Sequence, residues 1–285
     1  MEFITLNNGE NIAYVRVGSG EKKLLAIHGN YGSSIDFRRL IDNPPANCEV
    51  IVPDLRGFGD STYNTRITCL KDFAKDLIDF CEKLGITSDL YVLGWSLGGG
   101  VAMEMAIEAP SLVKKLFLMN ATSVCGYPLY KENSKREYVA FTSPEDLATN
   151  PFIAALYYAQ KSGKDQVYRD MVHLTFKDDA EKEEFLSTFL KQRNLLDADW
   201  ALAVFNITDK PNVYGVGTGE VYDIKCPVIL TTGDKDIMVP YVLVKQNIEA
   251  FMDRAKLIVY KDCGHSPIIE KTEETLKDIA EFLED

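Results

Sequence analysis

The sequence Gly94-Trp95-Ser96-Leu97-Gly98 lies between two regions with different patterns. The apolar run 90–93 precedes it and predicts a buried strand, while the run 101–109, which ends at Pro110, predicts a helix. A G-x-S-x-G motif in this setting places its serine on a strained strand-to-helix turn, where small flanking residues let the two elements approach closely. The context favours Ser96 as a nucleophile over a glycine-rich turn that carries no chemistry.

Strands and helices alternate on both sides of this motif. Continuous apolar runs are typical of parallel strands covered on both faces, and they occur at 24–27, 50–52, 116–119, 228–230 and 257–259. A leading hairpin is expected from 3–6 and 12–17, and helices are expected over 70–84 and 267–284. This order predicts an α/β fold with a mostly parallel sheet and helices on both of its faces.

The strand series stops after residue 119 and resumes at residue 228. Helical patterns fill the interval, at 144–160, 165–176, 180–193 and 198–207. We therefore expect residues 1–122 and 223–285 to form one α/β core and residues 123–222 to form a helical cap inserted into it. Half of the 30 aromatic residues fall within 124–222, which favours a largely apolar substrate pocket beneath the cap, with few charges pointing inward.

A serine nucleophile needs a base, and the chain offers three histidines. His28 ends a predicted strand in His-Gly and is better placed to shape a loop, while His173 lies within a predicted helix of the insertion. His265 follows a predicted strand, on a loop that leads into the last helix, and is the best candidate for the base. Its carboxylate partner would come from the loop after strand 228–230, where the residues alone leave both Asp234 and Asp236 open.

Composition narrows the classes of function further. The formal net charge is −12, which argues against binding to nucleic acids or to an anionic membrane. The N-terminus has no signal-peptide pattern and no apolar run approaches the ~18 residues of a membrane span, so we expect a cytoplasmic protein. The histidines and the six cysteines are scattered and form no C-x-x-C pair, so we expect no metal site. The sequence contains no nucleotide-binding motif, so we expect no cofactor. The sequence leaves a homodimer open.

Five motifs in this order resemble the α/β-hydrolase superfamily, in its capped branch of esterases and lactonases. They are His28-Gly29-Asn30, the loop Asp54–Ser61, the elbow Gly94–Gly98, the acid loop Gly233–Pro240 and the base loop Gly264–Pro267. The resemblance covers most of the chain outside the insertion. Such motifs are specific for the fold and far less specific for the substrate.

The resemblance implies a role for each matching residue. Ser96 would be the nucleophile, His265 the general base and then the general acid, and Asp236, rather than Asp234, its orienting partner. The backbone N–H groups of Asn30 and Leu97 would form the oxyanion hole. Because related haloalkane dehalogenases and epoxide hydrolases carry aspartate at the elbow, Ser96 argues against both of those activities.

The leading functional hypothesis is hydrolysis of a carboxylic ester, with a lactone as one form, of a small and largely apolar substrate. An alternative within the same chemistry is carbon–carbon bond hydrolysis of a vinylogous diketone. Transfer of the acyl group to an acceptor other than water, including peroxide, also stays open. A small-molecule receptor that retains the serine, histidine and aspartate is the alternative from another class.

Overall fold

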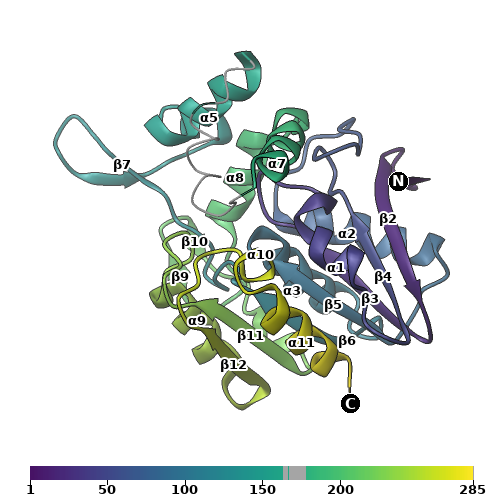
Figure 1. Ribbon diagram of the computed structural model, residues 1–285. Helices are drawn as coiled ribbons and strands as arrows, with labels where there is room; N and C mark the ends of the chain where they lie inside the picture. Colours follow the sequence, from purple (N-terminus) through teal and green to yellow (C-terminus); the bar gives the residue numbers. More distant parts are fainter. Residues whose placement is uncertain (163–165, 167–177, 285) are drawn as a thin grey trace.

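The computed structural model describes residues 1–162, 166 and 178–284. Eight strands form one sheet in the order β1-β2-β4-β3-β5-β6-β11-β12 (Figure 1). The pairs β1–β2 and β2–β4 are antiparallel and all other neighbours are parallel, as predicted. The strands are β1 (Glu2–Thr5), β2 (Asn11–Ser19), β3 (Lys22–Ile27), β4 (Cys48–Pro53), β5 (Leu90–Trp95), β6 (Val113–Met119), β11 (Val228–Gly233) and β12 (Ala255–Tyr260).

Helices cover both faces of this sheet because alternate side chains of each strand enter different cores. In β3, Leu25 and Ile27 belong to the core that also contains residues of α2 and α3, whereas Leu24 belongs to the core beneath α1 and α11. The predicted C-terminal helix is divided in two at Lys271, whose φ of −133° is not helical. The helices outside the region between β6 and β11 are α1 (Arg38–Asp42), α2 (Leu70–Lys83), α3 (Leu97–Glu108), α9 (Tyr241–Phe251), α10 (Pro267–Glu270) and α11 (Thr272–Leu283), with short 3₁₀ turns η1 (Ser34–Phe37) and η3 (Met252–Arg254).

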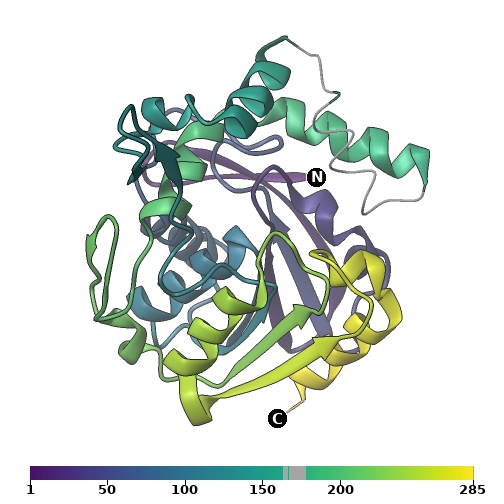
Figure 2. The same ribbon diagram turned by 90° about the vertical axis from the view of Figure 1, so that its left-hand side faces the viewer.

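Residues 120–227, which we call the inserted segment, leave the sheet after β6 and return to it at β11. Their helices lie above one end of the sheet in both views (Figures 1 and 2). The predicted helix 144–160 is two helices, because Pro151 begins a new one. The predicted helix 165–176 lies outside the described residues, apart from residue 166. The described helices and 3₁₀ turns of this segment are α4 (Pro144–Leu147), α5 (Pro151–Ser162), α7 (Asp179–Lys191), α8 (Leu195–Val204) and η2 (Glu220–Asp223).

Two small hairpins in the inserted segment were not anticipated from the sequence. They pair β7 (Tyr130–Glu132) with β8 (Tyr138–Ala140), and β9 (Pro211–Asn212) with β10 (Gly215–Val216). The β7–β8 hairpin projects from the body in Figure 1, which leaves Tyr130 and Tyr138 exposed. Strands of two or three residues carry too few alternating positions to reveal themselves as a pattern.

The inserted segment is attached to the body by the residues between α7 and α8. Arg193 N–H donates to Gly57 O at 2.7 Å, and Asn194 Nδ2 donates to Arg56 O at 2.7 Å. An apolar cluster that includes Phe141, Leu156 and Phe189 supports the helices above this junction. The segment thus has a small core of its own and a hydrogen-bonded attachment to the body.

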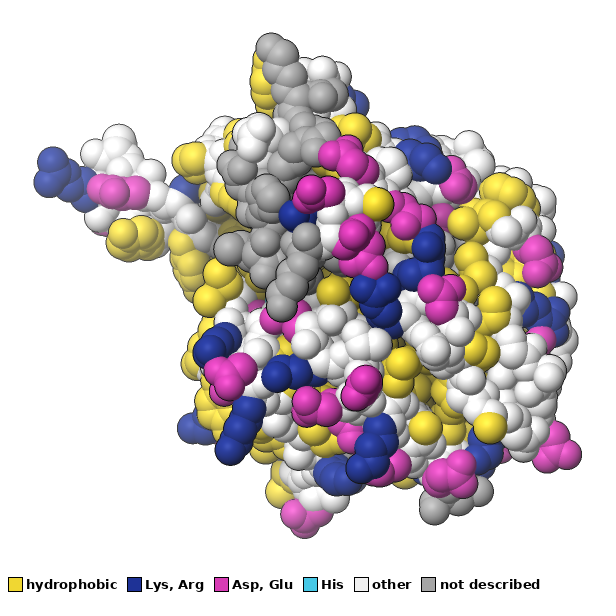
Figure 3. Space-filling view, in the orientation of Figure 1, with side chains coloured by type: hydrophobic (Ala, Val, Ile, Leu, Met, Phe, Trp, Pro, Cys, Tyr) yellow, Lys and Arg dark blue, Asp and Glu magenta, His cyan; other side chains and the backbone are white. Residues whose placement is uncertain are grey.

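Surface charges add less to this attachment. On the face shown in Figure 3, lysine and arginine side chains lie among aspartate and glutamate side chains. Ion pairs join α1 to α7, between Arg38 and Glu184 and between Arg39 and Glu181. Because these side chains are substantially exposed, each pair contributes ~1 kcal/mol or less. Within the described ranges, no helix combines the length and the apolar composition needed to cross a bilayer.

Candidate active site

Ser96 occupies the turn between β5 and α3. Its φ of 54° lies in the left-handed region, where a residue with a side chain is strained at a cost of ~1–3 kcal/mol. Strand β5 and helix α3 can approach because Gly94 has no side chain: a Cβ there would lie 2.3 Å from Gly98 O. A Cβ at Gly98 would in turn lie 2.2 Å from Ile27 O of β3. Ser96 is therefore held at the carboxyl edge of the sheet, in the setting predicted for the motif.

The end of β3 runs directly beside this serine. A Cβ added at Gly29 would lie 3.3 Å from Ser96 Cβ, so the backbone of the His-Gly-Asn turn passes close to it. Leu97 is the first residue of α3, where N–H groups have no acceptor within the helix. Among the described residues, no hydrogen bond from the Leu97 or Asn30 backbone N–H is found. Both N–H groups are available for a ligand.

The loops after β11 and β12 bring Asp236 and His265 together. His265 Nδ1 lies 2.8 Å from Asp236 Oδ2, while the other carboxylate oxygen accepts from Met238 N–H and Val239 N–H at 2.8 and 2.9 Å. Burial by itself raises the pKa of Asp236, but His265 and the other hydrogen bonds outweigh it, so the pKa is lowered. Asp234 is exposed and accepts instead from Cys263 N–H, so the structure places Asp236 and not Asp234 at the histidine.

His28 does not share this arrangement. His28 is fully buried, with Nδ1 2.7 Å from Gly29 O and Nε2 accepting from Leu55 N–H at 2.9 Å. Burial lowers the pKa of His28, and both of its nitrogens are engaged with the backbone. It shapes the loop, as its position in the sequence indicates. His173 lies outside the described residues.

Two polar residues that the sequence analysis did not identify brace this site. Asn120 Nδ2 donates to Asp236 Oδ2 at 2.8 Å and to Gly264 O at 3.1 Å. Glu270 accepts from the N–H groups on either side of His265, those of Gly264 at 2.7 Å and Ser266 at 3.0 Å. Asn120 directly follows the apolar run 116–119, so its place at the carboxyl edge of a parallel strand was a signal that could have revealed it.

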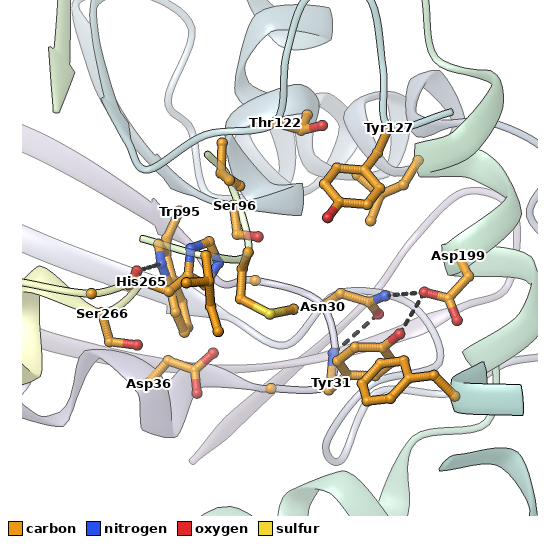
Figure 4. A pocket seen from close by; sticks show the side chains of 18 of the residues that line it. Asn30, Tyr31, Asp36, Trp95, Ser96, Thr122, Tyr127, Asp199, His265 and Ser266 are labelled. Carbon is orange, nitrogen blue, oxygen red and sulfur yellow. Dashed lines mark hydrogen bonds between the residues drawn. The ribbon is translucent and has the colours of Figure 1, made fainter. Parts of the chain in front are cut away.

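A cavity of about 600 Å³ opens at these residues. Ser96 and His265 line it from the body, and Figure 4 shows them together with Trp95, whose Nε1–H donates to His265 O at 2.8 Å. The inserted segment contributes mainly apolar and aromatic residues to the lining: Tyr127, Leu129, Phe152, Ile153, Phe185 and Leu202. The volume suits a small organic molecule, and three of these six residues are aromatic, as expected from the sequence.

Two buried carboxyl groups correct the expectation that few charges point inward. Asp199 of α8 lines the cavity, and its burial raises its pKa to about 7 against hydrogen bonds from Tyr31 and Asn30 that lower it. Asp36, from η1, also lines the cavity, and burial raises its pKa well above its ordinary value. A single acidic residue carries no mark of burial in the sequence, whether it lies in a helical pattern, as Asp199 does, or outside one, as Asp36 does.

The part of the chain that the structure describes contains no group of three or more histidine, cysteine or acidic residues suited to hold a metal ion. The chemistry available at the site is that of a serine hydroxyl, an imidazole with a carboxylate partner, and two backbone N–H groups beside the serine.

A family model described as the alpha/beta hydrolase fold matches residues 23–272. The chain belongs to the α/β-hydrolase family. Among curated relatives, this hydrolase is 25% identical to "Lipase 1" of Psychrobacter immobilis, over 98% of the chain and 82% of that protein. The predicted fold class is thereby confirmed.

Solved structures resemble this α/β-hydrolase over nearly its whole length. One is a thermophilic esterase from Thermogutta terrifontis, with a TM-score of 0.73, 21% identity and coverage of 99% of this chain and 98% of that one. Another is the enol-lactonase from Burkholderia xenovorans LB400, with a TM-score of 0.74, 16% identity and full coverage of both chains. At these identities the likeness establishes the fold alone.

Proposed function

We propose that this α/β-hydrolase cleaves a carboxylic ester of a small, largely apolar substrate through an acyl-enzyme on Ser96. The observation that carries the proposal is the 2.8 Å contact between His265 Nδ1 and Asp236 Oδ2 at the cavity that Ser96 also lines. With Nδ1–H donating to the carboxylate, Nε2 is the nitrogen that can accept a proton. The curated relative named a lipase supports ester chemistry.

The reaction follows from these groups in two halves. Ser96 Oγ attacks the ester carbonyl carbon while its proton passes to His265, and the oxyanion accepts hydrogen bonds from the N–H groups of Asn30 and Leu97. His265 then gives the proton to the departing alkoxide, which leaves as the alcohol. Water attacks the acyl-enzyme with His265 again as base, and the collapse of this second intermediate returns the proton to Ser96 and releases the acid.

In this proposal residues 123–222 form the cap that covers the substrate. Its apolar lining, which includes Tyr127, Phe152 and Phe185, would take the hydrocarbon part of the ester. One extra methylene in an apolar pocket changes kcat/KM by ~10–200-fold. Such a lining therefore allows a graded preference for chain length.

A fluorophosphonate probe tests the proposal directly. We expect one label, on the peptide that contains Ser96, and we expect Ser96→Ala to lose ester hydrolysis by ~10⁴-fold or more. Labelling at another residue, with full activity in the variant, would reject the assignment. The probe should be combined with p-nitrophenyl esters of graded chain length, a lactone and a ring-cleavage dienoate. Preferential turnover of the dienoate would favour carbon–carbon hydrolysis, and labelling without turnover would favour the receptor.

A further inference from the structure

The turn that carries Asn30 has a strained backbone. Tyr31, the next residue, has a φ of 66°, in the left-handed region that a residue with a large side chain rarely adopts. Asn30 Oδ1 accepts from Tyr31 N–H at 3.0 Å, which closes the turn locally. A turn of this kind keeps its shape only when surrounding contacts hold it.

Those contacts come from the inserted segment. Asp199 Oδ1 accepts two hydrogen bonds from the turn, one from Asn30 Nδ2 at 2.8 Å and one from Tyr31 Oη–H at 2.7 Å (Figure 4). Gln192 Nε2 donates to Asn30 Oδ1 at 3.2 Å. The Asn30 side chain is thus held at both its oxygen and its nitrogen by residues more than 160 positions away in the chain.

The burial of the Asp199 carboxyl group is energetically unfavourable. It is 6% exposed, and its second carboxylate oxygen finds no hydrogen-bond partner among the described residues. Burying a carboxyl group with one oxygen unpaired is unfavourable, and a neutral side chain would avoid the cost. The contacts that Asp199 does make are directed to the turn beside Ser96. Asp197, on the same helix, contacts Tyr63 and Arg66 instead.

We propose that Asp199 is a positioning residue for the oxyanion hole: by holding the Asn30 side chain and the Tyr31 hydroxyl, it fixes the direction of the Asn30 backbone N–H. This inference rests on the proposed function. An N–H group stabilises an oxyanion only when it points to within about 2.7–3.1 Å of the position where the charge develops. The inserted segment therefore acts on the transition state as well as on substrate choice.

The test compares three variants by their kcat and KM on one p-nitrophenyl ester. Asp199→Ala removes the acceptor and should lower kcat ~10–100-fold with KM within ~3-fold, because the interaction it supports forms in the transition state. Asp199→Asn keeps an oxygen that can accept both hydrogen bonds, so it should stay within ~3-fold of the wild type. Asp197→Ala is the matched control from the same helix and should leave kcat unchanged.

The affinity for a tetrahedral inhibitor is a second measurement, and it would not change if Asp199 had only a structural role. A boronic acid that adds to Ser96 should bind Asp199→Ala more weakly, by the same factor as the loss of kcat, while KM stays constant. Tyr31→Phe is a second variant in case Asp199→Ala does not fold. It removes one of the two hydrogen bonds and should show the same parallel loss, ~3–10-fold.

Three results would overturn the positioning role: a rise in KM at constant kcat, equal losses in Asp197→Ala and Asp199→Ala, or a loss in Asp199→Asn as large as in Asp199→Ala. If the wild type hydrolyses no ester and Ser96 takes no label, the proposed function is refuted and the positioning role falls with it. If the wild type is active and Asp199→Ala is equally active, only the positioning role is refuted.

Discussion

Asn120 Nδ2 lies 2.8 Å from Asp236 Oδ2, the same carboxylate oxygen that contacts His265 Nδ1. The amide also donates to Gly264 O, one residue before the histidine, so this one side chain contacts both the carboxylate partner of the proposed base and the loop that carries the base. Asn120 directly follows the last residue of β6. Its backbone φ of 43° is unusual for a residue that is not glycine.

We expect Asn120→Ala to lower kcat ~10-fold or more with little change in KM, because it frees the carboxylate and the histidine loop to move. Steady-state kinetics with a p-nitrophenyl ester measures this. Thr231→Val is the matched control, since the Thr231 hydroxyl meets the opposite end of the Asn120 amide, at 3.4 Å. A control variant as impaired as Asn120→Ala would assign the effect to general packing.

The two aspartates of the acid loop should differ sharply. Asp236→Asn places an amide beside His265 Nδ1 and disturbs the tautomer that leaves Nε2 free, so kcat should fall ~10²–10⁴-fold. Asp234→Asn should stay within a few-fold of the wild type, because Asp234 is exposed and contacts the Cys263 N–H instead. The reverse ranking in kcat would show that Asp234 is the functional partner.

Glu270 should act on the base through the backbone. Its carboxylate accepts from the N–H groups of both neighbours of His265, so Glu270→Gln replaces one acceptor with a donor and should lower kcat ~3–30-fold. Fluorophosphonate labelling of Ser96 should slow in proportion. Glu273→Gln, an exposed change at the start of α11, is the control and should leave both rates unaltered.

Glu104 of α3 gives a prediction about stability. Burial raises its pKa to about 7, although Lys71 Nζ lies 3.8 Å away and opposes the shift. Because the folded state holds this proton more tightly than the unfolded state, the free energy of unfolding falls as the pH rises between ~4.5 and ~7, by up to ~3 kcal/mol.

Glu104→Gln removes this dependence. Urea denaturation at several pH values should show that the variant gains stability relative to the wild type up to pH ~7, and that the difference is then constant. Its kcat/KM should match the wild type, because Glu104 does not line the cavity. A stability difference that is the same at pH 5 and pH 8 would contradict the assignment.

The body of the fold could be predicted because its elements carry strong local patterns. The uninterrupted apolar runs that became β3, β5 and β11 show burial on both faces, and the Ser96 motif has a required strand and helix around it. A contact between His265 and an aspartate of the loop after β11 follows from loops that meet at one edge of a parallel sheet. The choice of Asp236 over Asp234 came from the family resemblance.

The remaining contacts depend on the path of the chain in space. Asp199 meets Asn30 across 169 positions, and no local period records such a pairing. In the sequence Glu270 looks like an ordinary acidic residue near the start of a predicted helix. In the structure its carboxylate accepts a hydrogen bond from the loop that precedes this helix. Side chains that brace a site from another element can be recognised only once the fold is known.

The hydrogen bonds between residues 192–199 and the Asn30-Tyr31 turn limit how this enzyme can be re-engineered. A chimaera that receives the inserted segment of a relative would lose Gln192 and Asp199 while keeping the turn they hold. Such a graft should carry residues 30 and 31 with it, or else restore a donor at position 192 and an acceptor at position 199. Otherwise a change intended to alter specificity would also reduce turnover.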